Sequence, residues 1–130
     1  MIRPPLNSTA ASIAREFSWN TGRATMGDMP TYVILMKFTT KGAETLTESA
    51  ARFEGFDDGI RKLGGKVLSA YALLGEYDVL IVVELPDEKA VMKTLIRAAA
   101  RGTATSTTLT AIPLKEFYGL VRETLTPSSG

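Results

Sequence analysis

The feature that most constrains how this chain folds is the stretch of residues 69–87, in which two apolar runs flank a glycine. Runs rich in β-branched and aromatic residues predict strands, and Gly75-Glu76 between them predicts a β-hairpin with a two-residue type II′ turn, because glycine readily takes a positive φ. The second run is apolar on both faces, with one set of side chains at Val79, Ile81, Val83 and Leu85 and the alternate set at Leu80 and Val82. An antiparallel strand with one face in water should alternate apolar and polar residues. We therefore expect both faces of this strand to be buried.

Composition removes several kinds of chemistry. The 130 residues suit a single domain, and an apolar content of 45% is ordinary for a globular protein. The chain has no cysteine and no histidine, so disulfides, thiolate nucleophiles and the commonest general base and metal ligand are missing. Any proton transfer would fall to a carboxylate, a tyrosine or a lysine. We expect no cofactor and no metal site.

The charge pattern argues against nucleic acid and membranes as partners. The formal net charge is +1 and the chain has no basic run, whereas nucleic-acid-binding surfaces are strongly basic. Uninterrupted apolar runs, such as residues 79–83, are far too short to span a bilayer, which takes about 20 residues in a helix. We expect a cytoplasmic protein that binds neither nucleic acid nor membrane.

Residues 1–28 differ in composition from the rest and are interpreted as an N-terminal extension. They are rich in serine, threonine and alanine and carry three arginines against two acidic residues. This composition fits a targeting peptide, although the apolar core of a secretory signal is missing. The segment could instead be an arm whose Phe17 and Trp19 dock on a neighbouring subunit, or a flexible or artificial leader before a domain that opens at Met29. We do not expect function here.

The remaining pattern predicts alternating strands and helices. Phe53, Phe56, Ile60 and Leu63 recur at three- and four-residue spacing, which indicates an amphipathic helix. Asp87 suits the N-cap of a second helix and Gly102 its end. The predicted strands are Thr31–Phe38, 66–74, 77–85 and 103–112, and the predicted helices run from about residues 45–49 to 63, from 88 to 101 and from 114 to 125.

The order strand, helix, strand, strand, helix, strand predicts an α+β fold, the ferredoxin-like βαββαβ arrangement with a short C-terminal helix. Four antiparallel strands would carry both helices on one face and leave the other uncovered. Whether Tyr32, Ile34, Met36 and Phe38 or their alternates lie there, the apolar patch would exceed that of an ordinary monomer. We therefore expect residues 29–125 to pair with a second copy as a dimeric α/β barrel, followed by a loose tail at 126–130.

Several segments together resemble the GYD-domain family. They are residues 74–79 (Leu-Gly-Glu-Tyr-Asp-Val), 84–87 (Glu-Leu-Pro-Asp), 29–32 (Met-Pro-Thr-Tyr), 63–66 (Leu-Gly-Gly-Lys) and 107–111 (Thr-Thr-Leu-Thr-Ala). The likeness extends from about Met29 to Val121, in the family's order. It implies a small, mostly bacterial protein that forms a dimeric α/β barrel and has no established activity. Related barrels include cofactor-independent oxygenases, isomerases and ligand-sensing modules, an analogy of fold alone.

Two carboxylates are weak candidates for catalysis. Asp78 lies one residue inside the predicted third strand and could act as a desolvated base, although a strand-end aspartate more often accepts hydrogen bonds near a turn. Glu84 lies between Val83 and Leu85 and could be buried with a raised pKa. The ordinary alternative for Glu84 is an exposed strand end before Pro86.

The predicted ligand-binding residues are three tyrosines and one threonine. Tyr32, Tyr71 and Tyr77 could line a cavity, with their rings as apolar wall and their hydroxyls orienting a small molecule. Ordinary packing with a satisfied hydroxyl is the simpler interpretation. Thr107 shares a strand face with two apolar residues and could reach the same pocket.

Two functions remain open from the sequence. The first is a homo-oligomeric α/β-barrel protein that binds a small molecule or acts through assembly, with other copies of itself as the principal partner. The alternative is a cofactor-independent oxygenase or isomerase that uses Asp78 or Glu84 as base and a tyrosine as hydrogen-bond donor.

Overall fold

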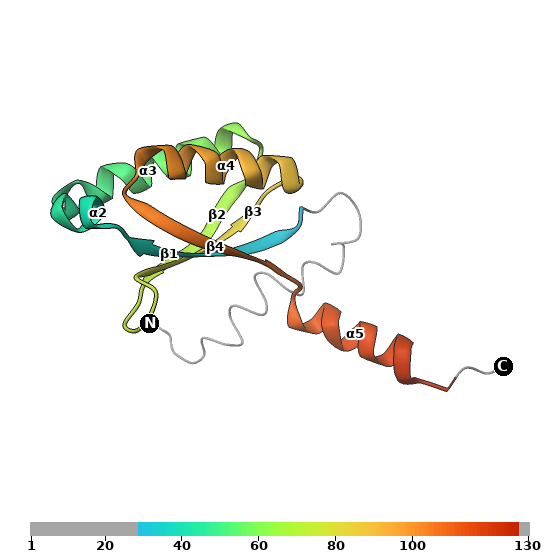
Figure 1. The fold of residues 1–130 in the computed structure, drawn as a ribbon. Coiled ribbons are helices and arrows are strands. Elements are labelled where there is room, and N and C mark those ends of the chain that lie inside the picture. The colour runs from blue at the N-terminus through green and yellow to red at the C-terminus, as the bar shows by residue number, and fades with distance from the viewer. Residues whose placement is uncertain (1–28, 128–130) are drawn as a thin grey trace, which may run out of the picture. The chain divides into compact units, whose positions relative to one another are not determined.

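A computed structural model describes residues 29–127 and confirms the predicted order of elements (Figure 1). In chain order these are β1 (Thr31–Phe38), α2 (Thr40–Glu44), a 3-10 turn η3 (Leu46–Glu48), α3 (Ser49–Lys62), β2 (Lys66–Ala72), β3 (Val79–Glu84), α4 (Glu88–Arg101), β4 (Ala104–Ala111) and α5 (Leu114–Leu125). The bounds of β1 and α5 agree with those predicted, whereas β2, β3 and β4 are shorter than predicted by up to two residues at an end. The interpretations of residues 1–28 lie outside the described residues.

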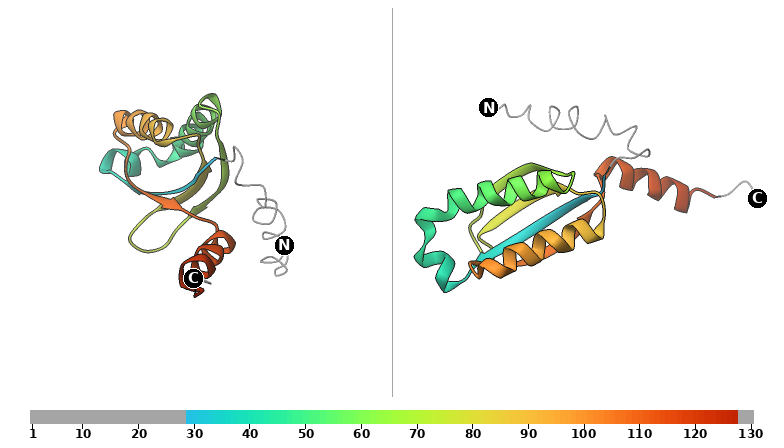
Figure 2. Two further views of the ribbon diagram at one scale, coloured as in Figure 1. Left: turned by 90° about the vertical axis from the view of Figure 1, so that its right-hand side faces the viewer. Right: turned by 90° about the horizontal axis from the view of Figure 1, so that it is seen from above.

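The strands form one antiparallel sheet in the order β2-β3-β1-β4, which is the ferredoxin-like α+β topology. Helices α3 and α4 run side by side across one face of this sheet (Figure 2). Among residues 29–111 no helix lies on the other face, which we call the open face. The face that α3 and α4 cover therefore carries the core of the domain, whereas no helix of residues 29–111 covers the open face.

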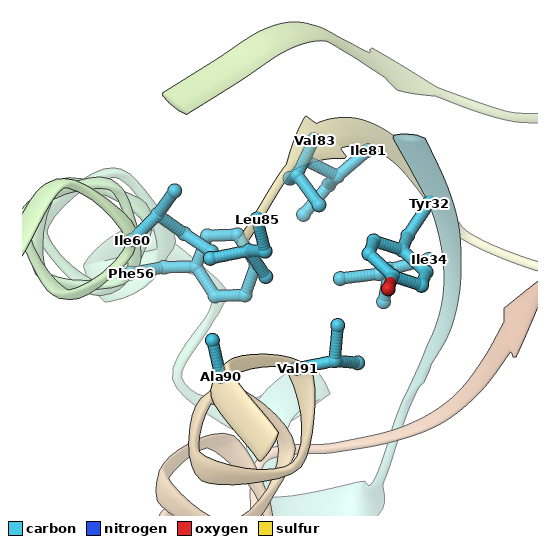
Figure 3. Close-up of a cluster of buried hydrophobic side chains, with 9 residues drawn as sticks. All are labelled: Tyr32, Ile34, Phe56, Ile60, Ile81, Val83, Leu85, Ala90 and Val91. Carbon is cyan, nitrogen blue, oxygen red and sulfur yellow. The ribbon is translucent and has the colours of Figure 1, made fainter. Parts of the chain in front are cut away.

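The core lies between the sheet and the two long helices (Figure 3). Its buried side chains come from β1, β3, the segment after β3, α3 and α4: Tyr32, Ile34, Phe56, Ile60, Ile81, Val83, Leu85, Ala90 and Val91. The sequence left open which strand face meets the helices. The structure assigns Tyr32 and Ile34 to the helix side, so their alternates Val33 and Leu35 point to the open face.

The hairpin between β2 and β3 differs from the two-residue turn that was predicted. The strands separate at Ala72 and Val79, and the backbone N–H of Leu73 donates to the carbonyl oxygen of Asp78 at 2.9 Å. The N–H of Asp78, one residue before β3, donates to the carbonyl oxygen of Met36 in β1 at 2.8 Å. The prediction of a positive φ at Gly75 is confirmed, at +112°.

Helix α2 lies between the predicted first strand and the predicted first helix, where the sequence pattern indicated no element. The side chain of Thr39 caps this short helix by accepting from the N–H of Gly42 at 3.1 Å, and its hydroxyl donates to the carbonyl oxygen of Gly102 at 2.7 Å. Lys41 adds a bond from Nζ to the carbonyl oxygen of Arg101 at 3.0 Å. The start of α2 is thus tied to the end of α4.

Helix α5 belongs to a second unit of the chain, separate from residues 29–111, and is described by itself. Its N–H groups begin to pair at Phe117, which donates to the carbonyl oxygen of Pro113 at 3.0 Å. The helix is amphipathic, and its apolar side chains are exposed: Leu114, Phe117, Tyr118, Leu120, Val121 and Leu125. None of the helices in residues 29–127 has the length and apolar character needed to cross a bilayer.

Candidate functional site

A cavity of about 490 Å³ opens between the sheet and the helices, at the end of β1 where α2 begins. This volume falls in the range of about 300–1,000 Å³ that is typical of small-molecule sites. Its walls are mostly apolar, with aromatic and aliphatic side chains from β1, β3 and α3: Met36, Phe38, Phe53, Phe56, Val79 and Ile81. The cavity is therefore the candidate functional site of residues 29–111.

Four of the residues that line the cavity are alanines. Ala50 and Ala98 come from the two helices, and Ala72 and Ala104 from the two outer strands of the sheet. Deeper in the same layer, large side chains such as Ile60 fill the gap completely. Small side chains on facing elements leave a hollow unless the backbones approach to close it.

Two arginines supply positive charge to this cavity. Arg52 lies on α3, and its Nη1 donates to the carbonyl oxygen and the hydroxyl of Thr45 at 3.1 and 3.0 Å. Arg101, at the end of α4, reaches across to α3 and donates from Nη1 to the carbonyl oxygen of Arg52 at 3.1 Å. The Nη2 atom of Arg52 is buried and finds no hydrogen-bond partner among residues 29–127.

The two glycines of α3 make room for arginines of α4. A Cβ placed on Gly55 would lie 3.1 Å from Nη2 of Arg101, and one on Gly59 would lie 2.9 Å from Nη1 of Arg97. The two guanidinium groups therefore lie against the helix backbone where side chains are missing. These glycines serve the contact between the helices.

Asp78 also lines the cavity, and its main contacts are structural. Its Oδ2 accepts from the backbone N–H of Phe38 at 2.8 Å. Its backbone N–H donates to the carbonyl oxygen of Met36 near the end of β1. Asp78 thus joins the start of β3 to the end of β1, which is the structural role considered for this residue.

The sequence profile of the GYD domain matches residues 32–121, which include all of the sheet except Thr31 and the whole cavity wall. The chain belongs to the GYD-domain family. A protein of Thermus thermophilus, described as a glutamine synthetase and cystathionine beta-lyase binding protein, is 37% identical over 95 residues, which are 72% of this chain and all of the relative. No solved structure matches the chain. The family resemblance that the sequence motifs indicated is confirmed.

In this GYD-domain protein the predicted tyrosines do not gather around one site. Tyr32 is buried among the core residues, 5% exposed, and burial raises its pKa above the ordinary value, with smaller contributions from the charges of Glu88 and Asp87. Tyr71 is 58% exposed and lies on the open face, and Tyr77 is half-buried in the hairpin loop. None of the three lines the cavity.

Thr107 and Glu84 also lie on the open face. Thr107 is exposed and pairs with Leu35 of β1, whereas Glu84 is half-buried and lies opposite Thr31. Side chains of directly paired residues point to the same side of a sheet, so both point away from the cavity. The two candidate carboxylates, Asp78 and Glu84, therefore cannot act on one substrate inside it.

Sequence reasoning missed the arginine that distinguishes the cavity, although a signal was present. Arg52 lies in the apolar stripe of α3, four residues before Phe56 and directly before Phe53. A positive charge inside an apolar stripe is unusual, because arginine is rarely buried without a partner. The four alanines carried no such signal, since each lies on a different element.

Proposed function

We propose that this GYD-domain protein is a non-enzymatic binding protein that assembles through the open face of its sheet and holds a small molecule in the cavity behind it. The observation that carries the proposal is the composition of the open face. Register places two uncharged, largely apolar rows across four strands: Tyr71, Leu80, Leu35 and Thr107 in one, and Ser69, Val82, Val33 and Leu109 in the other. Tyr71 is 58% exposed and Leu109 49%.

A second copy of the chain is the occupant that suits this face. The rows contain no charged residue, and charged side chains occur only toward the ends of the strands, at Lys37, Lys66 and Glu84. A two-fold dimer joins the same patch on both subunits, so an apolar patch meets an apolar patch without loss of hydrogen-bond partners. Two such sheets stack about 10 Å apart and bury their facing side chains.

The relative supports a role in binding proteins. The description of this relative names two enzymes as its partners, and the aligned region spans all of its length. Transferred to this chain, the description favours a module that docks on other proteins, with the dimer as the unit that docks. Pull-down experiments with glutamine synthetase and cystathionine β-lyase test whether this protein binds the same two enzymes.

The test measures mass in solution. Light scattering of the wild-type protein should give at least twice the mass of one chain, and Leu109→Asp and Tyr71→Asp should each shift the protein toward the single chain. Both positions are exposed in the single subunit, so the variants should keep their circular dichroism spectra. Ala51→Asp, on the exposed side of α3, introduces the same charge and should leave the mass unchanged. A wild-type protein that stays a folded single chain contradicts the assembly.

A cofactor-independent oxygenase or isomerase is the second candidate, and the position of Asp78 in the cavity wall favours it. As base, Asp78 would take a proton from the carbon beside a carbonyl, leaving an enolate that is protonated again at the same or another position. Phenylpyruvate in deuterium oxide tests this step, because exchange at its methylene carbon is visible by NMR. Exchange no faster than in buffer, or equal with Asp78→Asn, removes this candidate.

A further inference from the structure

We infer that the cavity selects a small apolar molecule carrying one negatively charged group, such as an arylalkyl carboxylate, and that Arg52 binds this group. The inference rests on the part of the proposed function that gives the cavity a ligand, and it names the ligand's chemical class. Assembly through the open face is independent of it.

The first observation is the state of the Arg52 guanidinium. Thr45 fixes its Nη1 through two hydrogen bonds, whereas its Nη2 is buried and unpaired within the described part of the chain. Within residues 29–127 Arg52 forms one ion pair, with Glu48, whose Oε1 lies 4.0 Å from Nη1 and whose side chain is 69% exposed. A buried charged donor without an acceptor is strongly unfavourable, so an acceptor from outside the chain would satisfy it.

The second observation is the balance of charge around the cavity. Its ionisable lining residues are Arg52, Arg101 and Asp78. The carboxylate of Asp78 already accepts from the N–H of Phe38, whereas Arg101 uses Nη1 for the carbonyl oxygen of Arg52 and places Nη2 beside Gly55. With Glu48 included, the helix side carries Arg52 and Arg101 against one exposed carboxylate, which leaves an excess of one positive charge there that a bound anion would neutralise.

The third observation is the character of the remaining wall. Phenylalanines and aliphatic side chains form most of it, and the volume of about 490 Å³ accommodates a ring with a short chain. A phosphate dianion or a nucleotide would need several convergent donors, usually backbone N–H groups at a helix start. One free guanidinium nitrogen in an apolar wall suits a singly charged, mostly apolar molecule.

A matched pair of probes tests the inference on the full-length protein. 4-Phenylbutyrate and 4-phenylbutan-1-ol share the same apolar part and differ in charge, and their affinities are measured by isothermal calorimetry. A charge-assisted hydrogen bond predicts that the carboxylate binds about tenfold more tightly or better. Equal affinities for the two probes overturn the inference while leaving a ligand-binding cavity in place.

Substitutions assign the preference to Arg52. Arg52→Met should reduce the ratio of the two affinities to within about twofold and keep binding of the alcohol. Arg52→Lys retains the charge and should keep part of the preference for the carboxylate. It is the control for a folding defect in Arg52→Met. Lys62→Met removes an exposed charge from the same helix and should change nothing. A preference that survives in a folded Arg52→Met protein overturns the role of Arg52.

A variant that fills the cavity separates this inference from assembly. Ala50 lines the cavity and is exposed to it, so Ala50→Trp should abolish binding of both probes while the mass in solution stays that of the wild type. If neither probe binds the wild-type protein at millimolar concentration, the inference and the ligand part of the proposed function both fail. The assembly through the open face is then judged by mass alone.

Discussion

The carboxylate of Asp78 accepts a hydrogen bond from the backbone N–H of Phe38, forty residues earlier in the chain, at 2.8 Å. The bond joins the first residue before β3 to the last residue of β1 and closes the corner of the sheet beside the cavity. Together with the backbone bond from Asp78 to Met36, this contact ties the base of the hairpin loop to β1.

Removal of the Asp78 carboxylate should destabilise the domain. Asp78→Ala leaves a part-buried N–H without an acceptor, and the free energy of unfolding measured in urea should fall by about 1–3 kcal/mol. Asp78→Asn keeps an acceptor oxygen and should lose less. Glu76→Ala, exposed in the same loop, is the control and should change the free energy by no more than about 0.5 kcal/mol. An unchanged Asp78→Ala protein would remove the structural role given to this bond.

Tyr32 should make the domain sensitive to alkaline pH. Burial, and after it the charges of Glu88 and Asp87, raises the pKa of Tyr32 from 10.0. Because the folded pKa exceeds the unfolded one, the folded chain holds the phenol proton more tightly. The stabilisation is present below about pH 10 and is lost as pH rises through the folded pKa. Urea unfolding at a series of pH values should show this decline in the wild-type protein.

Tyr32→Phe separates the effect of the Tyr32 hydroxyl on the free energy of unfolding from that of the lysines, which titrate in the same pH range. Phenylalanine keeps the ring in the core and removes the ionisable hydroxyl, so the decline in the free energy of unfolding above about pH 10 should be shallower. Tyr71→Phe is the matched control, because Tyr71 is largely exposed on the open face. Equal slopes for wild type and Tyr32→Phe would contradict the assignment.

Much of the fold could be read from the sequence because its signals are local. A run of residues that is apolar on both faces set the bounds of β1 correctly, and the predicted bounds of the last helix, residues 114–125, agree with α5. The caps of α4 also followed from single residues: Asp87 accepts from the N–H of Ala90 at 2.9 Å, and Gly102 takes a φ of +74°. Such features depend on a residue and its near neighbours.

The candidate site could not be read in the same way because it depends on contacts between distant segments. The alternation of side chains along a strand shows which residues share a face with Tyr32 or with Tyr71. Which of the two faces is covered by the helices depends on how distant segments pack. The cavity requires small side chains from four elements to meet. The bond between Asp78 and Phe38, which ties the base of the hairpin loop to β1, joins residues forty positions apart. Only the unusual position of Arg52 was visible in the sequence.

Gly42 should not tolerate a side chain, for reasons of space alone. An added Cβ would lie 2.0 Å from the carbonyl oxygen of Thr103, which is also the acceptor for the N–H of Thr39 at 3.0 Å. Gly42→Ala must push α2 away from the start of β4, and the free energy of unfolding should fall by about 1–3 kcal/mol. Gly119→Ala in α5, where the nearest atom is the Nη2 of Arg122 at 3.8 Å, should not destabilise the protein.

Gly75 should resist substitution for the opposite reason. An added Cβ would meet nothing within 4 Å, yet the φ of +112° is a conformation that other residues rarely adopt. Gly75→Ala should lower the free energy of unfolding by about 1–3 kcal/mol, and the β-branched Gly75→Val by more. Leu74→Ala at the fully exposed neighbouring position is the control. Because the space is empty, a loss of stability in Gly75→Ala must come from backbone strain. An unchanged free energy of unfolding would mean that the loop adopts another conformation at little cost.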